Sequence, residues 1–329
     1  AQYIILKRVP SFREKIYYKF VTNCVKILYN SALYWKHKER RRKSKMKKII
    51  LAAASIAMAC GIGFAAVGCG AKGDIVVISR ESGSGTRGAF MELIGLEDNE
   101  LVAGADEVNG TDVVTSSVED AEKAIGYISL GSLDTSRVKA IKVGGVDATV
   151  DNVKKGTYKL SRPFNVAWDK DGEANALRDD FLKYIASSQA QEIISEDYIS
   201  NVASPVEYVS PGNLEGTLTV GGSSSVTPLM QDLAKAYEEL NTEVTVTITQ
   251  TDSGTGMKDA AAGTIDLGMA SRELKDSEKT NLEYTAIALD GIAVIVNKAN
   301  PCTDLSVDQL KAIYSGEVEK WADVGVTFE

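Results

Sequence analysis

The chain has 329 residues, enough for about two domains, and 44% of them are apolar and 25% charged, as in ordinary globular proteins. Residues 1–45 hold 13 Lys+Arg and 2 Asp+Glu, whereas residues 69–329 hold 22 Lys+Arg and 43 Asp+Glu. This acidic body argues against nucleic acid as a partner. The single histidine, His37, lies outside the body, which excludes histidine-based triads and histidine-ligated zinc there.

Residues 46–68 have the pattern of a secretory signal peptide. A basic Met-Lys-Lys start precedes an uncharged run of 19 residues over 49–67. The Ala-Val-Gly-Cys sequence that ends at Cys69 resembles a bacterial lipobox, so we predict lipidation of Cys69 and a short tether over residues 69–73. The alternative is a transmembrane anchor, because 19 residues can just span a bilayer. Both interpretations place the body on the extracytoplasmic face of the cell membrane.

Residues 1–45 are basic and aromatic, and they precede the signal peptide. We interpret them as a doubtful leader, translated from upstream sequence, and exclude them from the fold; the alternative is a nucleic-acid-binding arm. Three of the four cysteines fall in the leader, in the signal peptide and at the lipid site, so Cys302 alone remains in the body. One cysteine forms neither a disulfide framework nor a metal cluster, and we expect no metal and no cofactor.

From Asp74 onward, strand-like runs alternate with helical ones, which predicts an α/β fold. The expected strands are 75–79, 124–128, 138–143, 217–220, 244–249, 265–270, 284–289 and 292–296. An amphipathic pattern predicts a helix over 176–185. A second helix is expected to begin at Thr227-Pro228, with Thr227 as its N-cap, and a third follows the capping box at 306–309.

Three turns rich in glycine and serine each join an expected strand to an expected helix. They are Arg80–Arg87, Gly221–Val226 and Thr251–Gly256. Glycine lets backbone N–H groups approach a ligand, serine and threonine add hydroxyl donors, and a helix start has unpaired N–H groups at its positive end. Each turn alone could simply cap a helix. Three in one chain, one of them carrying arginines, predict a site for a small tetrahedral oxyanion.

These turns and their surroundings resemble the phosphate-binding protein of the bacterial high-affinity phosphate ABC importer. The resemblance covers most of residues 74–329, through VGGSSSVTPLM, TDSGTGMKDAAAGTIDLGMASRELKDSE, LDGIAVIVNKANP, IYSGEVEKWADVG, IVVISRESGSGTRGAF, AIGYISLGSL and SRPFNVAW. It implies a two-lobe periplasmic-binding-protein fold of type II with a hinge. One lobe would comprise 74–163 plus 291–329, and the other 165–289. Because WADVG precedes IVVISRE in typical relatives, we also expect a circular permutation.

The resemblance implies a set of phosphate-binding residues as well. One lobe would supply Ser225, the backbone N–H of Val226, and Ser253. The other would supply Arg80 as a charged clamp, since its fork can contact two oxygens at once. In that lobe the donors at the helix start would be Ser84, Gly85 and Thr86.

Two positions depart from the family pattern. Arg272 stands where some relatives have the aspartate that accepts the proton of hydrogen phosphate, and Ser82 stands where some have an acidic residue. We include Arg272 among the candidate phosphate-binding residues, with a surface or interlobe salt bridge as the alternative. Another carboxylate would then accept the ligand proton, the candidates being Glu81, Asp252, Glu273 and Asp290.

The expected protein is a lipid-anchored, extracytoplasmic solute-binding protein that captures inorganic phosphate for an ABC importer. It would be a monomer, perform no chemistry, and have the permease and ATPase subunits as partners. The first alternative is the same fold binding another oxyanion, such as sulfate or molybdate. Two others are a secreted enzyme of the phosphatase type and a signalling or adhesion lipoprotein that has lost ligand binding.

Overall fold

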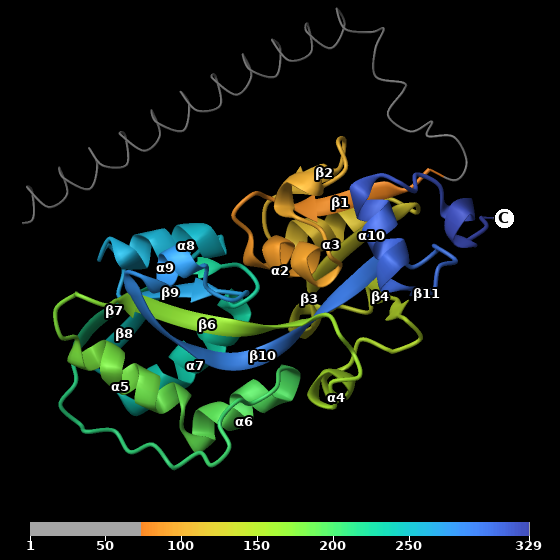
Figure 1. The fold of residues 1–329 in the computed structure, drawn as a ribbon. Coiled ribbons are helices and arrows are strands. Elements are labelled where there is room, and N and C mark those ends of the chain that lie inside the picture. Colours follow the sequence, from red (N-terminus) through yellow and green to blue (C-terminus); the bar gives the residue numbers. More distant parts are fainter. Residues whose placement is uncertain (1–73, 329) are drawn as a thin grey trace, which may run out of the picture. The chain divides into compact units, whose positions relative to one another are not determined.

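A mixed sheet of nine strands forms the centre of the computed structural model, which describes residues 74–328 (Figure 1). Its order is β2-β1-β3-β10-β6-β9-β7-β8, with β4 also paired to β10. The strands are β1 Val76–Arg80, β2 Asp106–Val108, β3 Ala124–Ser129, β4 Val138–Ala140, β6 Ser161–Asp169, β7 Gly216–Ser223, β8 Val244–Thr251, β9 Leu267–Ala270 and β10 Leu282–Asn297. A separate pair joins β5 Lys142–Val143 to β11 Asp304–Leu305.

Helices cover this sheet and connect its strands. They are α2 Gly85–Leu93, α3 Thr111–Asp120, α4 Val150–Lys154, α5 Ala176–Ile185, α6 Ser188–Asp197, α7 Thr227–Leu240, α8 Ser253–Ala261, α9 Asp276–Lys279 and α10 Val307–Ser315. Within the described residues, none of the helices is both long and apolar enough to cross a membrane. The expected leader, signal peptide, tether and lipidated Cys69 lie outside the described residues.

The buried apolar residues fall into two groups along the chain. Two core clusters draw their buried members from 77–160 and 292–321, and two others draw theirs from 164–288. We name these parts the β1 half and the β7 half. Strands β6 and β10 run antiparallel through the middle of the molecule (Figure 1), β10 pairing first with β6 and then with β3. The division into two moving lobes stays a prediction.

Several expected elements differ in detail from the observed ones. The expected strands 284–289 and 292–296 form the single strand β10, because the intervening Asp290 stays in the ladder opposite Arg162, which balances its charge. The expected strand 138–143 splits into β4 and β5, since its second part leaves β10 to pair with β11. Helix α7 has Val226, not Thr227, at its N-cap. Strand β6 was not among the expected strands.

Candidate functional site

The three glycine-serine turns meet in the folded chain. Strand β7 runs parallel to β8 and β9, with Ser223 opposite Thr251, so the turns that follow these strands lie at the same sheet edge. Strand β1 ends at Arg80 and brings the first turn to this edge from the other half. There the Gly254 N–H donates to the Gly83 carbonyl oxygen at 3.1 Å. The structure therefore brings together turns that are far apart in the sequence.

Glycine permits this close approach at Gly85, the first residue of α2. A Cβ atom at this position would lie 2.2 Å from the Ser253 hydroxyl and 2.9 Å from the Ser271 hydroxyl. Gly83, two residues earlier, has φ +93°, a conformation that favours glycine. The turn sequence thus lets the start of α2 contact hydroxyls of the β7 half.

Seven hydroxyl side chains gather where these turns meet, and each residue is more than nine-tenths buried. The Thr86 hydroxyl lies 2.8 Å from that of Ser225 and 3.2 Å from that of Ser271. The Ser223 and Ser271 hydroxyls are 2.9 Å apart. We call this set the hydroxyl cluster; its members are Thr86, Thr111, Ser223, Ser224, Ser225, Ser253 and Ser271.

Four of these hydroxyl oxygens accept hydrogen bonds from nitrogen donors, among them that of Ser223, which accepts from the Ser225 backbone N–H at 3.3 Å. The Ser224 hydroxyl accepts from Arg80 Nη2 at 3.0 Å, and the Ser253 hydroxyl accepts from the Ser271 backbone N–H at 3.1 Å. The Thr86 hydroxyl accepts from Arg162 Nη2 at 3.2 Å. A hydroxyl that accepts from N–H keeps its own hydrogen for an acceptor. The cluster therefore presents O–H donors, which suits a ligand made of acceptor oxygens.

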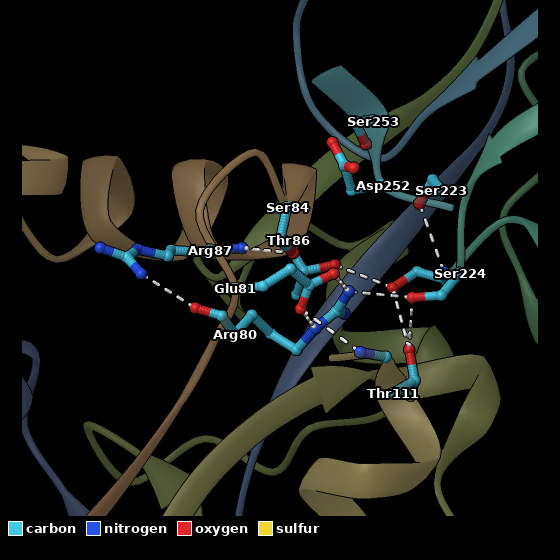
Figure 2. Close-up of polar contacts among 12 residues, drawn as sticks. Arg80, Glu81, Ser84, Thr86, Arg87, Thr111, Ser223, Ser224, Asp252 and Ser253 are labelled. Atoms are coloured by element: carbon cyan, nitrogen blue, oxygen red, sulfur yellow. Dashed lines mark hydrogen bonds and ion pairs between the residues drawn. The ribbon is translucent and has the colours of Figure 1, made fainter. Parts of the chain in front are cut away.

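Arg80 adds a buried positive charge to the hydroxyl cluster. Its guanidinium donates from Nε and Nη2 to the two carboxylate oxygens of Glu81, at 2.7 and 2.6 Å. Figure 2 shows both side chains directed toward Ser224 and Thr111. The Gly110 N–H donates to Glu81 Oε2 at 3.3 Å, which ties this carboxylate to the start of α3. Arginine and glutamate thus lie together beside the donors.

The predicted site residues have different surroundings in the structure. Thr86, Ser225 and Ser253 belong to the hydroxyl cluster. The Ser84 hydroxyl caps α2 by accepting from the Arg87 N–H at 3.4 Å. The Val226 N–H, expected to donate to phosphate, donates to the Ser223 carbonyl oxygen at 3.1 Å. The arrangement of Val226 is thus that of a turn residue.

Arg272 has its guanidinium bound to partners outside the hydroxyl cluster. Its Nη1 and Nη2 donate to the Glu278 carboxylate at 2.8 and 2.7 Å, and Nη1 also donates to the Glu273 carbonyl oxygen. Burial raises the pKa of Glu278, but hydrogen bonds from Arg272 and from the Lys275 N–H outweigh this effect, so the pKa is lower than usual. Arg272 and Glu278 both belong to the β7 half, so this bridge does not connect the two halves.

Sequence reasoning missed three residues outside the three turns that contact the predicted ones. Ser271 follows β9 directly and could have been found as a hydroxyl at the end of an expected strand. Thr111 begins α3, and its hydroxyl is 3.3 Å from that of Ser224. Arg162 lies in β6, where an arginine within an apolar strand is itself a signal of a specific partner.

Comparison with known proteins places this chain in a family. A model of the PBP superfamily domain matches residues 25–189 and 209–328, a match that begins within the basic segment 1–45. The chain is 41% identical to the phosphate-binding protein PstS 2 of Streptococcus agalactiae, covering 85% of this chain and 99% of that protein. It is 42% identical to the PstS 2 of Streptococcus pneumoniae serotype 4, with 84% and 98% covered.

A solved structure supports the same assignment. The crystal structure of a phosphate-binding protein of a phosphate ABC transporter from Streptococcus pneumoniae TIGR4 aligns with a TM-score of 0.62 and 43% identity, over 77% of this chain and all of that chain. The comparisons provide no evidence for a circular permutation, which stays a prediction. The expected α/β fold of the periplasmic-binding-protein type is confirmed. The chain belongs to the PBP superfamily and, within it, to the family of phosphate-binding PstS proteins.

Proposed function

We propose that this chain is an extracytoplasmic solute-binding protein that captures inorganic phosphate for an ABC importer. The hydroxyl cluster carries the proposal, because its hydroxyls are held as donors beside the buried cation Arg80. Phosphate is small, tetrahedral and rich in acceptor oxygens. Binding would replace hydroxyl–hydroxyl bonds with charge-assisted bonds from the hydroxyls and from Arg80, which are about twice as strong as neutral ones. The named relatives are phosphate-binding proteins, which supports this choice of ligand.

Calorimetric titration of the purified chain with phosphate tests the proposal. We expect saturable binding that Arg80→Ala weakens by at least about 10-fold, the effect of removing a charged hydrogen bond. The control is Arg137→Ala, because Arg137 also forms an ion pair, with Glu119, that lies outside the cluster. Absence of phosphate binding by the folded wild-type chain would refute the proposal. Sulfate and molybdate titrations would then test the other oxyanions.

Selectivity for phosphate depends on a carboxylate that accepts the ligand proton, and we assign this role to Glu81. Asp252 caps α8 by accepting from the Thr255 N–H and hydroxyl at 2.9 and 2.6 Å. The carboxylate of Asp290 is paired with Arg162, and Glu273 is exposed. Glu81 is the candidate that contacts the Arg80 clamp. Its negative charge would repel fully ionised sulfate but could accept the proton of hydrogen phosphate.

Glu81→Gln tests this assignment, because a neutral amide can donate to sulfate. We expect the preference for phosphate over sulfate, measured as the ratio of the two dissociation constants, to fall by at least about 10-fold. Glu119→Gln is the control, since Glu119 pairs with Arg137 away from the cluster. An unchanged ratio in Glu81→Gln would assign proton recognition to another group.

The proposal includes binding without chemistry and anchoring at the membrane. Relatives of this chain are named as binding proteins. Failure to hydrolyse a chromogenic phosphate ester with added divalent metals is the expected result, and turnover would support the phosphatase alternative.

Lipid attachment at Cys69 is tested by labelling cells with a radioactive fatty acid. Label that persists in Cys69→Ser would contradict lipid attachment at this cysteine. The proposed partners are the permease and ATPase subunits of the importer.

A further inference from the structure

A buried ion pair lies on the two long strands between the β1 half and the β7 half. Arg162 on β6 and Asp290 on β10 are register partners and are 3% and 1% exposed. Arg162 Nη1 lies 2.5 Å from Asp290 Oδ2. Burial lowers the pKa of Arg162 and raises that of Asp290, so burial disfavours both charges. Apolar residues often replace such pairs without loss of stability, so a buried ion pair is weak evidence for a purely stabilising role.

Asp290 fixes the position of this arginine. Its carboxylate also accepts from the Ser129 hydroxyl at 2.7 Å and from the Gly131 N–H at 3.4 Å, both in the β1 half. Arg162 Nη1 makes a second bond, to the Gly291 carbonyl oxygen at 2.8 Å. One edge of the guanidinium is therefore held by groups that belong to the strand framework.

The opposite edge of the guanidinium reaches the hydroxyl cluster. Nε donates to the Ser271 carbonyl oxygen, and Nη2 donates to the Thr86 hydroxyl, each at 3.2 Å. Nη2 has two N–H groups, and among residues 74–328 the Thr86 hydroxyl is the one group that accepts a hydrogen bond from it. A buried cation with a further N–H beside a group of hydroxyl donors is suited to an anionic acceptor.

We propose that Arg162 is a second cation of the anion site, which donates from Nη2 to bound phosphate and keeps the Thr86 hydroxyl pointed toward it. Asp290 serves as a positioning residue that holds the guanidinium in place. This inference rests on the proposed function. Each cation of the site is then paired with one carboxylate, Arg80 with Glu81 and Arg162 with Asp290. The bound anion is held by oriented donors more than by an excess of positive charge.

The double variant Arg162→Gln with Asp290→Asn tests the proposal without leaving an unpaired buried charge. Glutamine is shorter and neutral, so it can hydrogen-bond to the asparagine without reaching Thr86. We expect phosphate affinity, measured by calorimetry, to fall about 10- to 100-fold while the midpoint of thermal unfolding stays close to that of the wild type. Arg137→Gln with Glu119→Gln neutralises an ion pair outside the cluster and is expected to leave the affinity unchanged.

Two further results separate the possible failures. Wild-type affinity in the folded double variant would make the pair purely structural and overturn the proposal. Failure of the wild-type chain to bind phosphate would overturn the proposed function itself.

Arg162→Lys keeps the charge and the ion pair but lacks the fork, so we expect it to fold and to bind several-fold more weakly than the wild type. Unchanged affinity in Arg162→Lys would also count against donation from Nη2.

Discussion

At the residue scale, two glycines of the same helix should respond in opposite ways to alanine. A Cβ at Gly85 would lie 2.2 Å from the Ser253 hydroxyl, whereas a Cβ at Gly88 would meet only Arg272 Cδ, at 3.7 Å. We expect Gly85→Ala to weaken phosphate binding at least about 10-fold, because the cluster must spread to admit the methyl group. Gly88→Ala should raise the free energy of unfolding by about 0.5–1 kcal/mol.

Calorimetry and urea unfolding of both glycine variants check this prediction. Gly88→Ala is the matched control, since it adds the same methyl group to α2 three residues away. Equal phosphate affinity in the two variants would mean that the contact between α2 and Ser253 is not part of the binding site.

The Glu278 carboxyl provides a pH-dependent prediction at the same scale. Its pKa is lower in the folded chain than the ordinary 4.5, because the bonds from Arg272 and Lys275 outweigh burial, which acts in the opposite direction. A lowered pKa adds stability above pH 4.5, and this contribution is lost as the pH falls through the folded-state value. Glu278→Gln should therefore be less stable than the wild type at pH 7.

Urea unfolding at pH 7 and at pH 3 measures the difference between these two chains. We expect the difference to shrink at the lower pH, because the carboxyl of the unfolded chain binds a proton below its ordinary pKa of 4.5, so that the lowered pKa of the folded carboxyl contributes less stability. A difference that is the same at both pH values would show that charge on Glu278 does not stabilise the fold.

At the element scale, helix caps near and far from the site should have separable effects. Asp252 caps α8 at the hydroxyl cluster, and Ser306 caps α10, accepting from the Gln309 N–H at 3.1 Å. We expect Asp252→Ala and Ser306→Ala each to lower the free energy of unfolding by about 1 kcal/mol. Asp252→Ala should also weaken phosphate binding, because the start of α8 carries Ser253.

Thermal unfolding and calorimetry on the two cap variants provide the measurements. Ser306→Ala controls for the general effect of losing a cap. If phosphate binds equally well to both variants, then the start of α8 does not contribute to the site.

The turns at the site were predictable from sequence because their signals are local, whereas strand β6 was missed. The three turns were found because each has a strand, a glycine-serine run and a helix start within about ten residues. Arg162 and Thr111 were missed as site residues because their roles depend on contacts with Thr86 and Ser224, which no spacing in the chain reveals. Arg272 was included by resemblance, whereas its guanidinium is bound by Glu278, six residues away.

At the scale of the whole molecule, the acidic body and the proposed ligand carry charge of the same sign. Residues 69–329 hold 22 Lys+Arg against 43 Asp+Glu. The anion must approach a negative surface before it meets donors that lie more than nine-tenths buried. Long-range repulsion therefore acts on the rate of association, while the short-range hydrogen bonds determine how long the ligand stays.

This separation predicts that salt speeds the capture of phosphate. The Debye length falls from about 30 Å at 0.01 M to about 8 Å at 0.15 M ionic strength, so repulsion from the acidic surface is screened. We expect the association rate constant, measured by stopped-flow fluorescence, to rise several-fold across this range while the dissociation rate constant changes little. Sodium chloride and potassium chloride should act alike if screening is the cause. An association rate that falls with added salt would mean that Arg80 and Arg162 dominate the field at the entrance.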